Sequence, residues 1–156
     1  MDVTVRKASM LDCSAISEIH AEAFARQRDS EIWVSATLSA APRFYCFVAQ
    51  AGTGIVGYIF WAQKSGIRPE AVLELDQVAV CKKHRGIGYA EQLIQVSFKL
   101  VEEELASAGQ KVKAVLVSTR ADNPAQRLYS KTLGVKISAQ IDDLYSAKEV
   151  IMIAKR

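Results

Sequence analysis

The chain has 156 residues, of which 50% are hydrophobic and 24% are charged, a composition typical of a globular domain and not of a disordered or collagen-like chain. This length favours one domain over residues 1–156 with a sizeable core. The formal net charge of +3 is low for a chain that coats nucleic acid, so we expect no nucleic-acid partner.

Three widely spaced cysteines and two histidines indicate neither a disulfide framework nor a metal site. The apolar stretches have the length of strands, well below the ~20 residues that cross a bilayer, and the first residues lack the basic and apolar segments of a signal peptide. We therefore expect a cytoplasmic protein with no bound metal and no membrane partner.

The N-terminal part of the chain predicts one strand and two helices. Val3–Arg6 has the composition of a short strand, and Ser9 and Asp12 have the spacing of a capping box. Behind this box, apolar side chains recur on one helical face, at Ile16, Ile19, Ala23 and Phe24. A shorter helix is expected over Ser30–Leu38.

The rest of the chain predicts two further helices and six strands. A long helix follows Gly88, and a short one begins at Pro124 with Asn123 as its cap and ends near Gly134. The predicted strands cover Phe44–Gln50, Ile55–Trp61, Ala71–Val80, Lys113–Val117, Val135–Ala139 and Val150–Ala154. A hairpin followed by a β-α-β unit indicates an α/β (α+β) fold, a mixed sheet flanked by helices.

The most specific motif is the loop between the strand that ends at Val80 and the long helix. It is basic, with Lys82, Lys83 and Arg85, and it contains Gly86 and Gly88. Glycines let backbone N–H groups converge on one ligand, and the start of a helix adds positive potential, so the loop predicts a phosphate site. It matches neither the Walker A loop nor the complete dinucleotide fingerprint. The alternative is a turn that only caps the helix.

Three segments resemble the GCN5-related N-acetyltransferase (GNAT) family. Arg85-x-x-Gly88-x-Ala90, after a strand and before a long helix, resembles the family's Q/R-x-x-G-x-G/A signature. The segment from Asn123 to Tyr129, followed by Leu133-Gly134, is similar to the family's second motif. The stretch 5–12 resembles the family's opening, so the resemblance covers nearly the whole chain.

This resemblance implies a sheet splayed at its centre, with acetyl-CoA as cosubstrate. The amides of the glycine loop would hold the pyrophosphate, and the strand edge 78–80 would pair with the pantetheine arm and polarise the thioester carbonyl. The implied cofactor-binding residues are Val78, Ala79, Val80, Arg85, Gly86, Ile87, Gly88, Tyr89, Ala90 and Asn123.

The implied activity is transfer of an acetyl group to a primary amine by direct attack on the thioester. The acceptor is a small-molecule amine or a protein amine, and the oligomeric state is open, a homodimer included. Two other hypotheses are a non-catalytic acyl-CoA-binding regulatory or interaction domain and a nucleotide-dependent transferase. The presence of Tyr129 and Glu74 favours catalysis over binding alone.

The reaction needs a base for the amine and an acid for the leaving thiolate. Tyr129 matches the position at which similar enzymes place a tyrosine near the coenzyme sulfur, although packing alone would also explain it. Glu74 and Asp76 interrupt an apolar strand and, by the two-residue alternation, share one face, so a cleft beside that face would explain both. Glu74 lies at the distance from Arg85 at which several similar enzymes carry a base.

The remaining candidates are weaker. Cys81 and His84 have the spacing of a nucleophile and its base, but we expect an apolar filler and a solvent-facing loop residue. His20 is expected to be a half-buried helix residue. Four aromatic residues are assigned to the core by default, with the acceptor pocket as the alternative: Phe24, Trp33, Trp61 and Tyr145.

Overall fold

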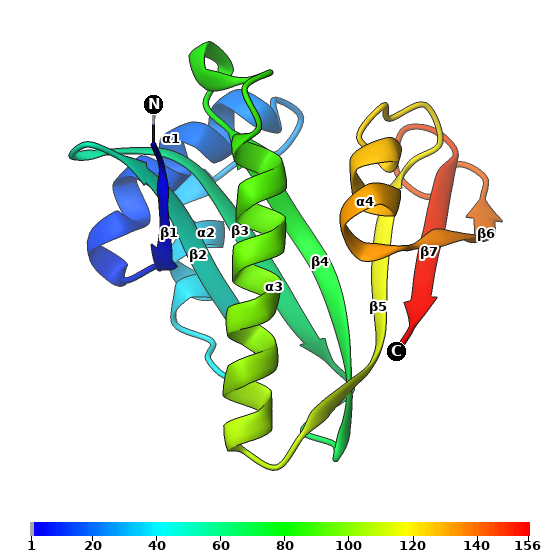
Figure 1. Cartoon of the computed structure of the whole chain (residues 1–156). Coiled ribbons are helices and arrows are strands. Elements are labelled where there is room, and N and C mark those ends of the chain that lie inside the picture. Colours follow the sequence, from blue (N-terminus) through cyan, green and yellow to red (C-terminus); the bar gives the residue numbers. More distant parts are fainter. Residues whose placement is uncertain (1) are drawn as a thin grey trace.

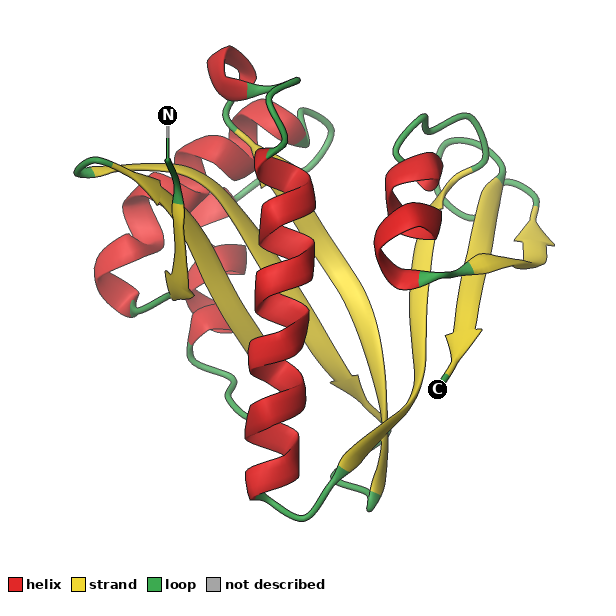
Figure 2. Cartoon of the chain, viewed as in Figure 1, coloured by secondary structure: helices red, strands yellow, loops and turns green. Residues whose placement is uncertain are grey.

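The computed structural model describes residues 2–156, which form a mixed sheet with helices on both faces (Figures 1 and 2). The strands are β1 Thr4–Lys7, β2 Phe44–Ala51, β3 Gly54–Lys64, β4 Glu70–Val80, β5 Lys111–Arg120, β6 Lys136–Ile141 and β7 Glu149–Lys155. The helices are α1 Cys13–Ala23, α2 Ser30–Leu38, α3 Tyr89–Ser107 and α4 Gln126–Leu133, with short 3-10 turns η1 Met10–Asp12 and η2 Lys82–His84. The predicted order of strands and α-helices and the predicted fold class are confirmed.

The seven strands follow the order β1-β2-β3-β4-β5-β7-β6. Only the β4–β5 pair is parallel, as expected for a β-α-β unit whose crossover is α3. The neighbouring pairs are antiparallel.

Each face of the sheet has its own apolar core. Side chains of α3 and α4 pack on one face with alternate residues of the strands, in a cluster that includes Leu73, Leu93 and Tyr129. Residues of α1 and α2 pack on the opposite face with Tyr58 and Phe60. Trp61 lies in the first core, where its indole N–H donates to Ser97 at 2.8 Å, and is therefore not part of an acceptor pocket.

The sheet opens between its two central strands. Pairing of β4 with β5 runs from Glu70–Lys111 to Glu74–Leu116 and stops there, although both strands continue. Figure 1 shows the two strands diverging toward their carboxyl ends. Residues 75–80 of β4 and 117–120 of β5 therefore have one edge without a neighbouring strand, which agrees with the expected splay.

A β-bulge lies in β4 at the start of this opening. Phe60 pairs with Gln77, whereas the next residue, Trp61, pairs with Leu75, so Asp76 is the extra residue. A bulge of this kind redirects neighbouring side chains. Asp76 and Gln77 consequently both lie toward the α1–α2 face, which the two-residue alternation does not predict.

The start of α4 differs from the prediction. Asn123 and Pro124 form a turn ahead of the helix, which begins at Gln126. Asn123 still caps the turn, because its Oδ1 accepts the N–H of Ala125 at 2.9 Å. The predicted end of the helix is confirmed, since Gly134 has the left-handed conformation, with φ 71°.

Candidate active site

The loop between β4 and α3 presents free backbone donors. The amides of Gly86, Ile87 and Gly88 donate to no acceptor among residues 2–156. Gly86 and Gly88 have φ values of 79° and 92°, and a Cβ at either position would meet no atom within 4 Å. The 19 residues of α3 follow directly, with their positive end at the loop. These features suit an anion such as a pyrophosphate.

Ionic and hydrogen-bond contacts attach this loop to the rest of the fold. Glu22 of α1 accepts the amide N–H of Lys82 at 2.5 Å and lies 3.9 Å from the guanidinium of Arg85. The Nε of Arg85 donates to the carbonyl of Val80 at 2.8 Å. The positive charge of Arg85 is therefore paired within the protein and stabilises the conformation of the loop.

The open edge of β4 carries the donors expected for the pantetheine arm. The N–H of Cys81 points to β3, where it donates to the carbonyl of Val56 at 2.8 Å. Because N–H directions alternate along a strand, Ala79 also faces β3, whereas Val78 and Val80 direct their N–H groups away from β3 and into the opening.

Tyr129 lies on α4, which covers the same face of the sheet as α3. It is 7% exposed and its ring belongs to the core cluster, but its hydroxyl has no hydrogen-bond partner among residues 2–156. Burial raises the pKa of Tyr129, which keeps the phenol protonated at neutral pH. An unpaired, protonated hydroxyl is what a proton donor to a thiolate requires.

The two predicted carboxylates share the opposite face, as expected. Glu74 lies 3.6 Å from the ammonium of Lys64. Burial, reinforced by the negative charge of Glu74, raises the pKa of Asp76 to about 6. Asp76 is therefore ionised at neutral pH yet close to its pKa, a condition that favours it as a general base.

The raised pKa of Asp76 predicts a pH-dependent cost in stability. The pKa of Asp76 is about 6 in the folded state, above the ordinary value of 3.8, so the folded protein binds the proton more tightly than the unfolded chain does. The protonated carboxyl therefore favours the folded state at low pH, and this contribution to stability is lost as pH rises toward and through 6. Two pKa units correspond to about 3 kcal/mol at most. We expect Asp76→Asn to raise the free energy of unfolding by roughly 1–3 kcal/mol at pH 8, and to have little effect at pH 3.5.

Denaturant unfolding at the two pH values measures this difference. Asp142→Asn, at a carboxylate whose side chain is 87% exposed, is the control and should change neither value. A gain from Asp76→Asn that is equal at both pH values would contradict the assignment of the cost to ionisation.

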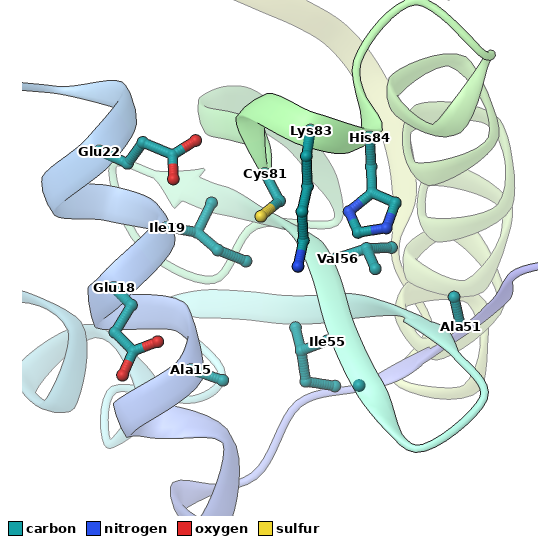
Figure 3. Close-up of a pocket in the computed structure, with 11 residues that line it drawn as sticks. Ala15, Glu18, Ile19, Glu22, Ala51, Ile55, Val56, Cys81, Lys83 and His84 are labelled. Atoms are coloured by element: carbon teal, nitrogen blue, oxygen red, sulfur yellow. The ribbon is translucent and has the colours of Figure 1, made fainter.

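A separate cavity of about 440 Å³ lies beside the loop (Figure 3). Figure 3 shows Lys83 and His84 projecting into it opposite Ile19. His84 is half-buried, its ring packs near that of Tyr89 at 6.4 Å, and its Nδ1 is buried without a partner, so the expected solvent-facing position is wrong. Lys83 and His84 of the loop line this cavity. It is distinct from the predicted catalytic site, because its lining does not include Glu74, Asp76 or Tyr129.

Comparison with known proteins identifies the family. The model of the acetyltransferase (GNAT) family matches residues 13–135. The chain belongs to the GNAT family. A search of curated proteins finds no significant match to this sequence.

Solved structures of other GNAT-like proteins show the same fold at low identity. Ard1 from Thermoplasma volcanium is 18% identical, with a TM-score of 0.79 and coverage of 99% of this chain and 98% of that one. NAA60 from Arabidopsis thaliana in complex with acetyl-CoA is 15% identical, with a TM-score of 0.77 over 99% and 98% of the two chains. The ribosomal-protein-S18-alanine N-acetyltransferase from Escherichia coli is 16% identical, with a TM-score of 0.79 over 99% and 94%.

Acetyl-CoA is the cosubstrate of GNAT enzymes, and the loop of this chain fits it. The amides of Gly86, Ile87 and Gly88 have no acceptor among residues 2–156, and the space beside the two glycines is open, as binding of a pyrophosphate requires. When bound, the cosubstrate supplies an activated acetyl thioester. Asn123 lies outside the loop, and both polar atoms of its side chain are already bonded within the protein. Its Nδ2 donates to Thr119 at 2.8 Å and its Oδ1 caps the turn. Its role toward the cofactor stays a prediction.

The structure adds two buried polar residues, on the same face of the sheet as Asp76, that the sequence did not single out. Gln77 is buried and its Oε1 accepts the hydroxyl of Tyr58 at 3.1 Å. Glu149 is 8% exposed, and its Oε2 is buried without a partner. Val150 of β7 belongs to the core under α4, so by alternation Glu149 faces the same side as Asp76. Gln77 and Glu149 could have been found from the sequence, because each is a polar residue in an otherwise apolar strand.

Proposed function

We propose that this protein transfers the acetyl group of acetyl-CoA to a primary amine by direct attack of the amine on the thioester. The observation that carries this proposal is the opening between β4 and β5, with a different set of groups on each side. The loop amides and Tyr129 lie at the end and face occupied by α3 and α4, whereas Asp76 lies on the face of α1 and α2. Cosubstrate and acceptor then approach the opening from opposite faces.

The proposed reaction uses one group from each side. Asp76 accepts a proton from the acceptor amine, and the amine nitrogen forms a bond to the thioester carbonyl carbon. The N–H groups of Val78 and Val80 donate to the carbonyl oxygen, where negative charge develops. The C–S bond breaks and Tyr129 gives its proton to the departing sulfur. The extra proton left on the attacking nitrogen passes through solvent to the Tyr129 oxygen, which restores the phenol and yields the neutral amide and free thiol.

The distribution of charge supports an amine as acceptor. The acceptor side carries the carboxylates of Glu74, Asp76 and Glu149, of which Glu149 has an unpaired oxygen. The loop that would hold the cosubstrate carries lysines and Arg85. A cationic amine is attracted to the first set and an anionic cofactor to the second.

The two carboxylates are separated by the pH dependence of their variants. We expect kcat/KM of the unmodified enzyme to fall below about pH 6 as Asp76 becomes protonated. Asp76→Asn should lower kcat/KM at pH 7 by about 10²–10⁴-fold. The loss should shrink as pH approaches the pKa of the acceptor amine, where free amine is abundant.

Glu74→Gln serves as the matched control. The negative charge of Glu74 raises the pKa of Asp76. Removal of that charge should therefore move the fall in kcat/KM to lower pH, and kcat/KM at pH 7 should decrease much less than in Asp76→Asn. A loss in Glu74→Gln that high pH restores, beside a flat response in Asp76→Asn, would assign the base to Glu74.

A panel of amines tests the proposed activity. The Escherichia coli neighbour acetylates an alanine of a ribosomal protein, so a peptide with an N-terminal alanine is the first candidate, beside a polyamine and an aminoglycoside. Incubation with acetyl-CoA should release free thiol and form one acetylated amine. Tight acetyl-CoA binding with no transfer to any amine would instead support a binding domain.

A further inference from the structure

His20 of α1 is a buried titratable residue to which the proposed reaction gives no role. It is fully buried, and both ring nitrogens are bonded: Nδ1 lies 2.8 Å from the hydroxyl of Ser30, and Nε2 lies 2.8 Å from Oε1 of Gln27. A carbonyl oxygen only accepts, so Nε2 carries the hydrogen. His20 thereby holds one atom of Gln27, a residue of the α1–α2 connection, in a defined place.

The same oxygen of Gln27 connects the α1–α2 connection to β4. The Nε2 of Gln77 donates to it at 3.5 Å, and Oε1 of Gln77 in turn accepts the hydroxyl of Tyr58. Gln77 directly follows Asp76 at the bulge. The chain of bonds from His20 to Tyr58 therefore fixes the α1–α2 connection relative to the strand that carries the proposed base.

The nitrogen of the Gln27 amide is left without a partner. Its side chain is exposed, and no acceptor among residues 2–156 binds Nε2. Because Oε1 and Nε2 are bonded to the same carbon, anchoring the oxygen on a buried histidine also places the nitrogen. Two N–H donors thus stand at the acceptor side of the sheet, next to the residue that follows Asp76.

We propose that His20 is a positioning residue for the acceptor, which it serves by holding the Gln27 amide where it donates to a carbonyl of the acceptor. This inference rests on the proposed function. Because the side chain of Gln77, the residue directly after Asp76, bonds the Gln27 amide, an acceptor that engages both Asp76 and Gln27 carries its amine and its carbonyl close together. The chemical class with that arrangement is an α-amino amide, in which only two carbons separate the amine nitrogen from the carbonyl oxygen, as at the N-terminus of a peptide.

Two acceptors that differ in this carbonyl test the proposal: the amide of the peptide Ala-Ala-Ala, and isopropylamine, which has the same branched amine carbon without a carbonyl. We expect His20→Phe and Gln27→Ala each to raise KM for the peptide about tenfold, the effect of one lost hydrogen bond, with kcat within about twofold. Kinetic constants for isopropylamine and the Kd of acetyl-CoA should not change.

Two further variants separate positioning from a general structural effect. His20→Gln offers an N–H to Gln27 and should restore most of the peptide KM. The double variant His20→Phe/Gln27→Ala should be no worse than Gln27→Ala, because both changes remove the same donor. Equal losses with both acceptors, additive losses in the double variant, or no loss in Gln27→Ala would overturn the proposal.

The outcome stays decisive if His20→Phe does not fold. Gln27 is exposed, so Gln27→Ala alone then compares the two acceptors. Failure of the proposed function is a different result, namely unmodified enzyme that acetylates no amine. Unmodified enzyme that acetylates isopropylamine but not the peptide would overturn the present inference alone.

Discussion

Tyr129→Phe is expected to lower kcat by about 10²–10⁴-fold, the usual contribution of general acid catalysis. The substitution removes only the hydroxyl, which has no partner within residues 2–156, and leaves the ring in the core beneath α4. Stability and the Kd of acetyl-CoA should therefore remain nearly unchanged. Steady-state kinetics with the best acceptor of the amine panel measure the loss.

Tyr145→Phe is the matched control, since it removes the same group from a residue that is 76% exposed. Its kcat should equal that of the unmodified enzyme. If Tyr129→Phe keeps kcat within about twofold, Tyr129 is a packing residue and the sulfur receives its proton from another source.

Gly88→Glu is expected to weaken acetyl-CoA binding by at least about 100-fold, the equivalent of roughly one or two charge-assisted hydrogen bonds. The φ of 92° strains any side chain at this position, and a carboxylate would occupy the space above the free amides. Negative charge at the start of α3 would then compete with the pyrophosphate for the same donors. Titration calorimetry with acetyl-CoA measures the change in Kd.

Gly66→Glu controls for the backbone strain. Gly66 has a nearly identical φ of 94° and equally open surroundings, but it lies in the turn between β3 and β4. Both variants should lose similar stability, and only Gly88→Glu should lose binding. Unchanged affinity in Gly88→Glu would show that the cosubstrate does not use this loop.

The elements that dominate the fold were predictable because their signals are local. Apolar periodicity located α1 and α3, and turn glycines located the β2–β3 hairpin and the end of α4. The glycine loop was predictable for the same reason, since a strand end, two glycines and a helix start are adjacent in the sequence. Its free amides and open glycines are present as that reasoning requires.

The acceptor side was less predictable because tertiary packing creates it. The bulge at Asp76 depends on the pairing of β4 with β3, and it brings Gln77 to the same face as Asp76. The raised pKa of Asp76 follows from burial by elements far along the chain. His20 was expected to be half-buried, but it is fully buried, with a partner ten residues away at Ser30. No local pattern in the sequence encodes such contacts.

The most direct test of the account is a rapid-quench measurement with acetyl-CoA labelled in its acetyl group. Direct transfer predicts that free thiol appears only when amine is present, with one labelled amide formed for each thiol and no label on the protein. A burst of thiol in the absence of amine, accompanied by label on a residue such as Cys81, would contradict direct attack and show a covalent acetyl-enzyme.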